Sequence, residues 1–204
     1  FMNVEGCTVT HICDLDIKKL EIAKKKYPSI NTTNSIDQIF ENSEIDAIVI
    51  ATPVSTHYDL ASKALESNKH TLVEKPLTNN VEQAQILGKK AKDKNKILMI
   101  DHTYLYTPAI QKIKELIDSD SLGEIQYIDS TRINLGLFQT DVNVIWDLAV
   151  HDIAICCYLL NEKPISVQAV GISHTKSELE NIAYITLNYK SQKLIHFNCS
   201  WISP

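Results

Sequence analysis

The first hundred residues alternate between two patterns of hydrophobic and polar positions. Short, nearly continuous apolar runs, typical of strands, cover residues 7–14, 45–51, 70–74 and 96–101. Between them, apolar residues recur at helical spacing over residues 16–27, 35–42, 55–68 and 80–95. Strands that alternate with helices predict βαβ units and a parallel, doubly wound sheet. The run over 45–51 has almost no polar position, so we expect a strand buried on both faces.

After about residue 103 the alternation gives way to separate helical and strand-like regions. Helical spacing covers residues 107–120 and 144–160, and strand-like alternation covers residues 125–134. Three more strand patterns follow with short turns, at residues 164–174, 180–190 and 192–202. Consecutive strands without an intervening helix indicate an antiparallel meander. We therefore expect an α/β domain over 1–103, then an α+β domain with a mostly antiparallel open sheet over 104–204.

Composition and charge exclude several kinds of partner. The 204 residues are 44% hydrophobic, enough for a core in each domain, and the formal net charge is −5. An acidic chain whose lysines are spread over helical segments gives no reason to expect nucleic acid or a membrane as a partner. No apolar run approaches the ~18 residues of a membrane span. The five cysteines, an odd number without a Cys-x-x-Cys pair, indicate a reducing, cytoplasmic location.

Polar residues follow the predicted strands at the carboxyl edge, where an open parallel sheet binds its ligands. Asp14 closes the first strand, and in dinucleotide-binding folds an acid in this position accepts hydrogen bonds from the adenosine ribose hydroxyls. A carboxylate there repels a 2′-phosphate, so Asp14 favours NAD over NADP. The alternative is that Asp14, or Asp16, only caps the helix over 16–27.

Two further segments at this edge carry turn-forming residues. Thr52 and Pro53 follow a strand, and the helix expected to begin at Ser55 offers free N–H groups to an anion or a ribose. Lys75 follows the next strand, and Pro76 keeps it out of the helical conformation. The Lys75 ammonium can stabilise an alkoxide as hydride leaves a substrate. The alternatives are an ordinary turn with a capped helix, and a lysine that faces solvent.

The helix predicted over 144–160 carries an acid and a histidine. Asp147 and His151 are four residues apart and therefore lie on one face of an α-helix. A carboxylate beside an imidazole orients the ring and raises its basicity. Oxidation of a secondary alcohol needs a group that accepts the hydroxyl proton, and histidine is suited to this near neutral pH. The alternative is that Asp147 stabilises the helix N-terminus and His151 is a core residue, with Asp152 structural.

Three motifs in this order and spacing make the chain resemble the Gfo/Idh/MocA oxidoreductases over essentially its whole length. They are "ATPVSTH" at 51–57, "EKP" at 74–76 and "WDLAVHD" at 146–152, together with the strand-end Asp14 and "TPA" at 107–109. The resemblance implies a dinucleotide-binding Rossmann domain over 1–103 and a substrate and oligomerisation domain over 104–204.

The resemblance also implies roles for individual residues. Lys75 contacts the substrate and the nicotinamide ribose, often next to a cis Lys–Pro bond. Asp147 positions the substrate, and His151 is the acid/base. The residues expected around the nicotinamide half of the cofactor are Thr52, Pro53, His57, Glu74 and Lys75. The residues expected to contact substrate from a strand leading to the site are Arg132 and Asn134, and no metal is expected.

Two features of the family are not found in the sequence. The Gly-rich turn and first strand that hold the pyrophosphate are missing, and family sheets continue beyond "SWISP". We therefore expect a fragment, inactive by itself, of a protein that forms a homo-oligomer at full length.

The leading hypothesis is an NAD-dependent dehydrogenase that transfers hydride between nicotinamide and a hydroxyl-bearing carbon of a sugar or nucleotide sugar, with NADP less favoured. The second is a non-catalytic dinucleotide-binding sensor or scaffold, although such a protein has no use for Lys75, Asp147 and His151 together. The third is a dihydrodiol or imine reductase of the same superfamily, which keeps the fold and changes the substrate.

Overall fold

The structure, a computed structural model, describes residues 1–136, 138–176 and 178–204. Contacts divide the chain into two compact units, each assembled from several segments. The first unit consists of Phe1–Ile50, Asp59–Leu72 and Gln85–Met99, and the second of Ala51–Tyr58, Val73–Ala84 and Ile100–Pro204. The second unit thus includes two segments that follow strands of the N-terminal half, and these segments carry the "ATPVSTH" and "EKP" motifs. The domain boundary at residue 103 stays a prediction.

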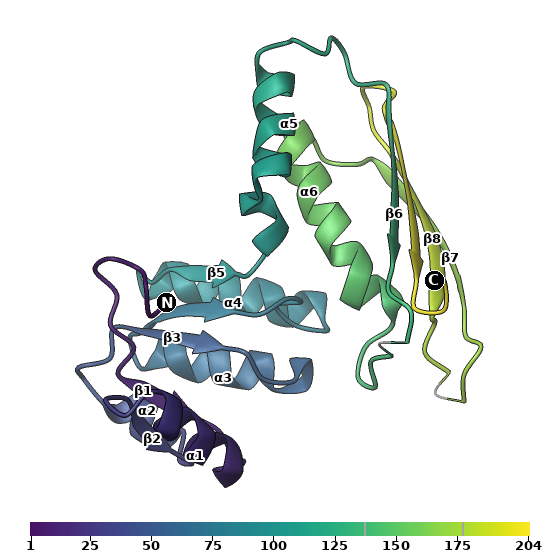
Figure 1. Cartoon of the computed structure of the whole chain (residues 1–204). Helices are drawn as coiled ribbons and strands as arrows, with labels where there is room; N and C mark the ends of the chain where they lie inside the picture. The colour runs from purple at the N-terminus through teal and green to yellow at the C-terminus, as the bar shows by residue number, and fades with distance from the viewer. Residues whose placement is uncertain (137, 177) are drawn as a thin grey trace. The chain divides into compact units, whose positions relative to one another are not determined.

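Short parallel strands separated by helices form the N-terminal half of the chain (Figure 1). Strand β1 (His11–Cys13) pairs in parallel with β2 (Asn31–Thr33), and α1 (Ile17–Lys26) connects them. A second sheet has the order β3 (Ala47–Ile50), β4 (His70–Val73), β5 (Leu98–Ile100). The helices between these strands are α2 (Asp37–Glu41), α3 (Val54–Glu66) and α4 (Val81–Asp93). This alternation confirms the predicted Rossmann-like architecture.

Backbone hydrogen bonds show that β4 and β5 run in the same direction. The Thr71 N–H donates to Ile97 O over 2.9 Å near their starts, and the Asp101 N–H donates to Val73 O over 2.8 Å at their ends. The carboxyl ends of the two strands therefore lie at one edge of this sheet, as the sequence predicts.

Two details of the N-terminal half differ from the sequence prediction. The strand predicted over 45–51 is not buried on both faces, because Ile48 and Ile50 are buried whereas the Val49 side chain is 47% exposed. Strand β2 was not predicted, because its sequence Asn-Thr-Thr has no apolar residue. The open question about the cap of α1 is settled: the Asp16 carboxylate accepts from the Lys18 N–H and Asp16 is the N-cap.

The C-terminal half combines helices with a four-stranded mixed sheet (Figure 1). A 3₁₀-helix η1 (Thr103–Tyr106) precedes α5 (Pro108–Asp118) and the strand β6 (Tyr127–Ile133). A π-helical turn η2 (Ile145–Ala149) then continues into α6 (Val150–Leu160), and β7 (Ser166–Ile172), β8 (Ile182–Asn188) and β9 (Leu194–Ser200) follow. Strands β7, β8 and β9 are antiparallel neighbours, which confirms the meander, and β6 joins the sheet parallel to β9 in the order β6-β9-β8-β7.

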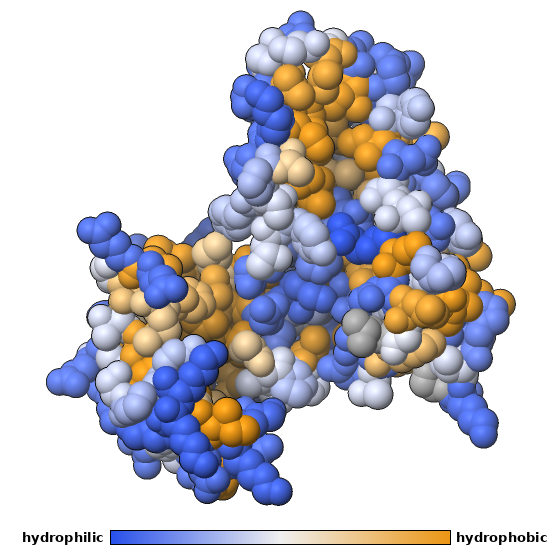
Figure 2. Space-filling model, in the orientation of Figure 1, coloured by the Kyte–Doolittle hydropathy of each residue, from blue (hydrophilic) through white to orange (hydrophobic). Residues whose placement is uncertain are grey.

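One face of this sheet forms the core of the second unit. Alternate residues of β8 and β9 are buried with η2, α6 and Trp201, and the cluster includes Ile185, Ile195, Phe197 and Leu148. Strand β7 is exposed along its whole length. Figure 2 shows further hydrophobic side chains gathered over α5, where Ile113 is exposed. None of the described helices has both the length and the apolar character that crossing a membrane requires.

Candidate active site

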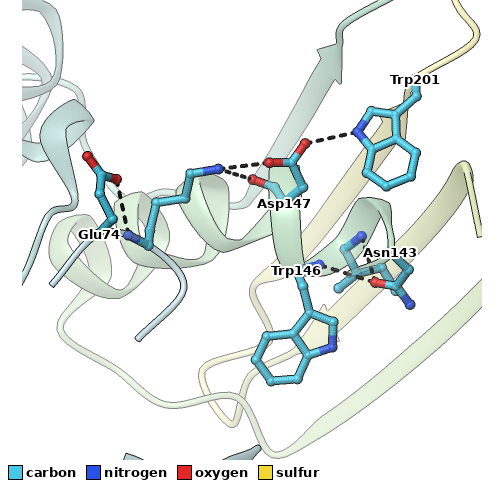
Figure 3. Close-up of polar contacts among 7 residues, drawn as sticks. Glu74, Asn143, Trp146, Asp147 and Trp201 are labelled. Carbon is cyan, nitrogen blue, oxygen red and sulfur yellow. Dashed lines mark hydrogen bonds and ion pairs between the residues drawn. The ribbon is translucent and has the colours of Figure 1, made fainter. Parts of the chain in front are cut away.

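The segment after β4 brings a lysine to an acid of the π-turn. Lys75 Nζ donates to Asp147 Oδ1 over 2.8 Å and to the Asp147 backbone carbonyl over 3.0 Å (Figure 3). The pair is mostly shielded from solvent, with side chains 21% and 11% exposed. The Lys75–Pro76 peptide bond is cis, as the family resemblance implies. The structure therefore brings together two of the three residues predicted to be catalytic.

Sequence reasoning missed the second partner of Asp147. The Trp201 indole Nε1–H donates to Asp147 Oδ2 over 2.9 Å (Figure 3). Each carboxylate oxygen thus has its own donor, an ammonium on one side and an indole on the other. The signal available in the sequence was weak: a buried tryptophan needs a hydrogen-bond acceptor, but nothing in the sequence says which one.

The helix that carries Asp147 begins with a π-turn rather than an α-turn. The sequence predicts one α-helix over 144–160, whereas Ile145–Ala149 is π-helical and only Val150–Leu160 is α-helical. The Asn143 carboxamide caps the start, because its Oδ1 accepts from the Ile145 and Trp146 N–H groups over 3.1 and 3.3 Å. Single π-turns inside α-helices are frequent at functional sites.

His151 lies one turn after Asp147, in a partly buried position. Burial, together with the nearby cations of Lys75 and Arg132, lowers the pKa of His151 to about 4. Its Nδ1 is buried and has no hydrogen-bond partner among the described residues, and the ring meets Tyr104 edge-on at 4.8 Å. The expectation that Asp147 raises the basicity of His151 is therefore wrong, because Lys75 and Trp201 occupy both Asp147 oxygens. At neutral pH the imidazole is neutral and able to accept a proton.

Arg132 is paired with Asp152 on α6. Its Nε and Nη2 donate to Asp152 Oδ2 and Oδ1 over 2.7 and 3.1 Å, and the Ser130 hydroxyl adds a 2.8 Å bond to Oδ1. The guanidinium also lies over the Tyr104 ring, 4.4 Å from its centroid. The structural role considered for Asp152 agrees with this pairing. A substrate contact by Arg132 stays a prediction.

Replacing Asp152 with asparagine is expected to lower the free energy of unfolding by about 3–5 kcal/mol, because it leaves the Arg132 charge without its partner in a largely buried site. The side chains of the pair are only 19% and 6% exposed. Urea denaturation of the full-length protein measures the effect. Glu115→Gln, which breaks the exposed Lys112–Glu115 pair, should cost less than about 1 kcal/mol. Equal costs for the two variants would contradict this account.

A cavity of about 560 Å³ opens beside the Lys75–Asp147 pair. Its walls come from the second unit, and they are residues 51–55, 57, 74–76, 139–142 and Asp147. Thr52, Pro53, His57, Glu74 and Lys75, the residues predicted around the nicotinamide, all belong to this set. The start of α3 at Val54 also lies in the wall, and the first N–H groups of a helix can donate to the hydroxyl oxygens of a ribose. The residues present therefore fit the nicotinamide half of a dinucleotide.

His57 holds two walls of the cavity together. Its buried imidazole lies between two backbone carbonyls, with Nδ1 2.9 Å from Pro76 O and Nε2 2.8 Å from Thr52 O. These bonds join the segment after β3 to the segment after β4. By fixing these two segments His57 could contribute to cofactor binding indirectly. Its predicted role around the nicotinamide stays a prediction.

The remaining predicted residues lie outside this cavity. His151 and Arg132 do not line it, although the Lys75 charge in its wall acts on His151. Asn134 is exposed, and its backbone N–H donates to Ser200 O over 2.9 Å. Asp14 belongs to the first unit, where one carboxylate oxygen accepts from the Asp16 N–H over 2.9 Å and the other lies 3.7 Å from Lys19 Nζ. The roles of Asn134 and Asp14 stay predictions.

The loop between β6 and η2 supplies cavity residues that the sequence did not reveal. Gln139, Thr140 and Asp141 line the wall, and all three are exposed. They belong to no recognisable motif, and only the fold brings them beside Lys75.

Comparison with sequence families gives two matches that together span almost the whole chain. Residues 1–102 match the family described as "Oxidoreductase family, NAD-binding Rossmann fold". Residues 110–204 match the family described as the GFO/IDH/MocA C-terminal domain.

Individual relatives agree with these matches. The chain is 33% identical over 158 residues to UDP-N-acetylglucosamine 3-dehydrogenase of Acidithiobacillus ferrooxidans, covering 76% of this chain and 48% of the relative. It is 31% identical over 139 residues to the NAD⁺-dependent scyllo-inositol 2-dehydrogenase of Bacillus subtilis, covering 66% and 41%. The chain thus spans about half the length of these relatives.

A solved structure shows the same fold. Myo-inositol 2-dehydrogenase from Lactobacillus plantarum superimposes with a TM-score of 0.90 at 18% identity, over 98% of this chain and 64% of that one.

Proposed function

The chain belongs to the Gfo/Idh/MocA family of oxidoreductases, and on this premise we propose that the full-length protein is an NAD-dependent dehydrogenase of a sugar or nucleotide sugar. It would transfer hydride between the nicotinamide and a ring carbon that bears a hydroxyl group. The observation that carries this proposal is the Lys75–Asp147 hydrogen bond at the wall of a cavity, one helical turn from a neutral histidine.

The proposed chemistry assigns a distinct task to each of these side chains. Lys75 would donate a hydrogen bond to the reacting hydroxyl and stabilise the oxygen as negative charge develops on it. Asp147 keeps that ammonium in place. Neutral His151 would accept the hydroxyl proton. The bound dinucleotide would supply the hydride acceptor, and Thr52, Pro53 and Glu74 would hold its nicotinamide end.

The charges on the cavity wall limit the class of substrate that we expect the cavity to bind. Its wall carries the carboxylates of Glu74, Asp141 and Asp147, against the single ammonium of Lys75. Carboxylates accept hydrogen bonds from hydroxyl groups and repel anions. We therefore propose that the ring oxidised in this cavity is uncharged or carries an amine. If the substrate is a nucleotide sugar, its diphosphate lies outside the cavity.

Two further proposals concern the cellular context. All five cysteines are free, and Cys156 and Cys199 are buried among core residues, which supports a reducing, cytoplasmic location. The exposed strand β7, with Val170 67% exposed, supports a homo-oligomer that covers this side of the sheet at full length.

Assays with the full-length protein test the proposed activity. NAD⁺ or NADP⁺ is offered with a panel of neutral sugars, inositols, amino sugars and nucleotide sugars, and the reduced nicotinamide is followed by its absorbance. We expect turnover with at least one hydroxyl-bearing substrate, and a preference for NAD⁺ that Asp14→Ala weakens. Tight NAD⁺ binding without turnover of any of these compounds, in either direction, would instead favour a dinucleotide-binding sensor.

A further inference from the structure

We infer that Trp201 is a positioning residue for the proposed reaction: its indole N–H fixes the plane of the Asp147 carboxylate and, through it, the Lys75 ammonium. The catalytic effect of Trp201 rests on the proposed function. The contact itself, a 2.9 Å hydrogen bond from Trp201 Nε1 to Asp147 Oδ2, rests on the geometry alone (Figure 3).

The need for such a residue follows from the flexibility of the lysine–aspartate pair. The terminal torsion of an aspartate side chain is broad, so a carboxylate held by one donor can still rotate. A lysine has a flexible four-carbon stem and three rotatable donors, so it does not impose a plane on its partner. A second donor on the other oxygen removes this freedom, because the two donors then approach the carboxylate from opposite sides.

Trp201 is suited to this task because the protein fixes it firmly. It is 1% exposed and belongs to the hydrophobic core of the second unit. Its backbone N–H donates to Asn181 O over 2.9 Å, and its carbonyl accepts from the Gly136 N–H over 3.0 Å. An indole N–H only donates, so its bond to Asp147 has a single sense. The core therefore holds Trp201 in place, Trp201 orients the Asp147 carboxylate, and Asp147 orients the Lys75 ammonium.

The chain offers a matched control for this tryptophan. It contains only two tryptophans, and Trp146 is the direct sequence neighbour of Asp147. Figure 3 shows the Trp146 ring directed away from the Asp147 carboxylate, and its backbone N–H is bound by Asn143 Oδ1. Trp146→Phe therefore changes an indole close to the site without removing a donor from Asp147.

Kinetics of the full-length protein form the first test. Loss of a hydrogen bond to a charged group should make Trp201→Phe lower kcat roughly tenfold to a hundredfold. The dissociation constant of NAD⁺ should stay unchanged, and Trp146→Phe should keep wild-type kcat. If Trp201→Phe fails to fold, β-(3-benzothienyl)alanine at position 201 keeps the ring volume and removes only the N–H. A wild-type kcat in Trp201→Phe, or in the benzothienylalanine protein if only that one folds, would overturn the inference.

Nuclear magnetic resonance of the indole N–H group gives a second test that needs no turnover. The spectra are recorded on the full-length Trp146→Phe protein. The Trp201 signal is the one that disappears when Trp201 is also replaced by phenylalanine, which distinguishes it from the signal of any other tryptophan of the full chain. We expect the Trp201 signal to exchange slowly with solvent and to shift when Asp147 is replaced by alanine or Lys75 by methionine. An unchanged signal in both variants would refute the contact. If the signal responds but wild type turns over no substrate, the proposed function fails and the positioning contact stands.

Discussion

Replacing Lys75 with methionine in the full-length protein is expected to lower kcat by roughly a hundredfold to a thousandfold, the usual cost of removing one donor from a developing oxyanion. Methionine keeps most of the side-chain volume and removes the ammonium. The reacting hydroxyl would lose its donor, and Asp147 would keep only Trp201 as a partner for its charge. Steady-state kinetics with the best substrate of the panel measures the effect.

The Lys75 prediction has a direct control. Lys190 is exposed, and Lys190→Met should leave kcat unchanged. NAD⁺ affinity, measured by calorimetry, should largely survive in Lys75→Met, which separates lost chemistry from lost binding. Wild-type turnover by Lys75→Met would remove Lys75 from the mechanism.

Replacing His151 with glutamine is expected to lower kcat/KM by roughly a hundredfold to ten-thousandfold, the range typical of a lost general base. Glutamine keeps a polar side chain of similar size but cannot accept a proton near neutral pH. His196→Gln is the matched control. His196 lies on the sheet, where its ring contacts the Thr186 hydroxyl, and its replacement should leave the activity unchanged. If both variants behave like wild type, His151 is not the base.

The pH dependence of His151 has a definite sign. Burial, reinforced by Lys75 and Arg132, lowers its pKa to about 4 from the ordinary value of 6.5, so the folded protein binds this proton less readily than the unfolded chain. His151 therefore contributes stability fully above pH 6.5, and this contribution is lost as the pH falls towards 4. Between pH 6.5 and 4, the free energy of unfolding should fall less in His151→Gln than in wild type, as measured by denaturation. The acid limb of kcat/KM should lie near pH 4 in wild type.

The sequence was sufficient for the features that depend on local periodicity. The alternating runs located β3, β4 and β5 and the helices between them, and the three consecutive strand patterns located β7, β8 and β9. The polar strand β2 escaped because a three-residue strand without apolar residues has no periodic signal. The π-turn escaped because Ile145–Ala149 has the same apolar spacing as an α-helix.

For the site, sequence reasoning found residue types but not their partners. The motifs named Lys75 and Asp147, and the fold places them in direct contact. The Trp201 bond to Asp147 spans 54 residues, and the Arg132–Asp152 pair spans 20 residues. Contacts at such separations are set by how β6, β9 and α6 pack, and no spacing rule in one sequence encodes them. Sequence reasoning therefore assigned Asp147 to His151, whereas the structure gives it to Lys75 and Trp201.

The central claim is that Lys75 and His151 act on the same substrate hydroxyl group. A crystal structure of the full-length protein with NAD⁺ and its sugar substrate tests this most directly. We predict that Lys75 Nζ and a ring nitrogen of His151 both lie within about 3.2 Å of one hydroxyl oxygen. A substrate hydroxyl bound by Lys75 alone, with the His151 ring turned towards a different cavity, would contradict the account.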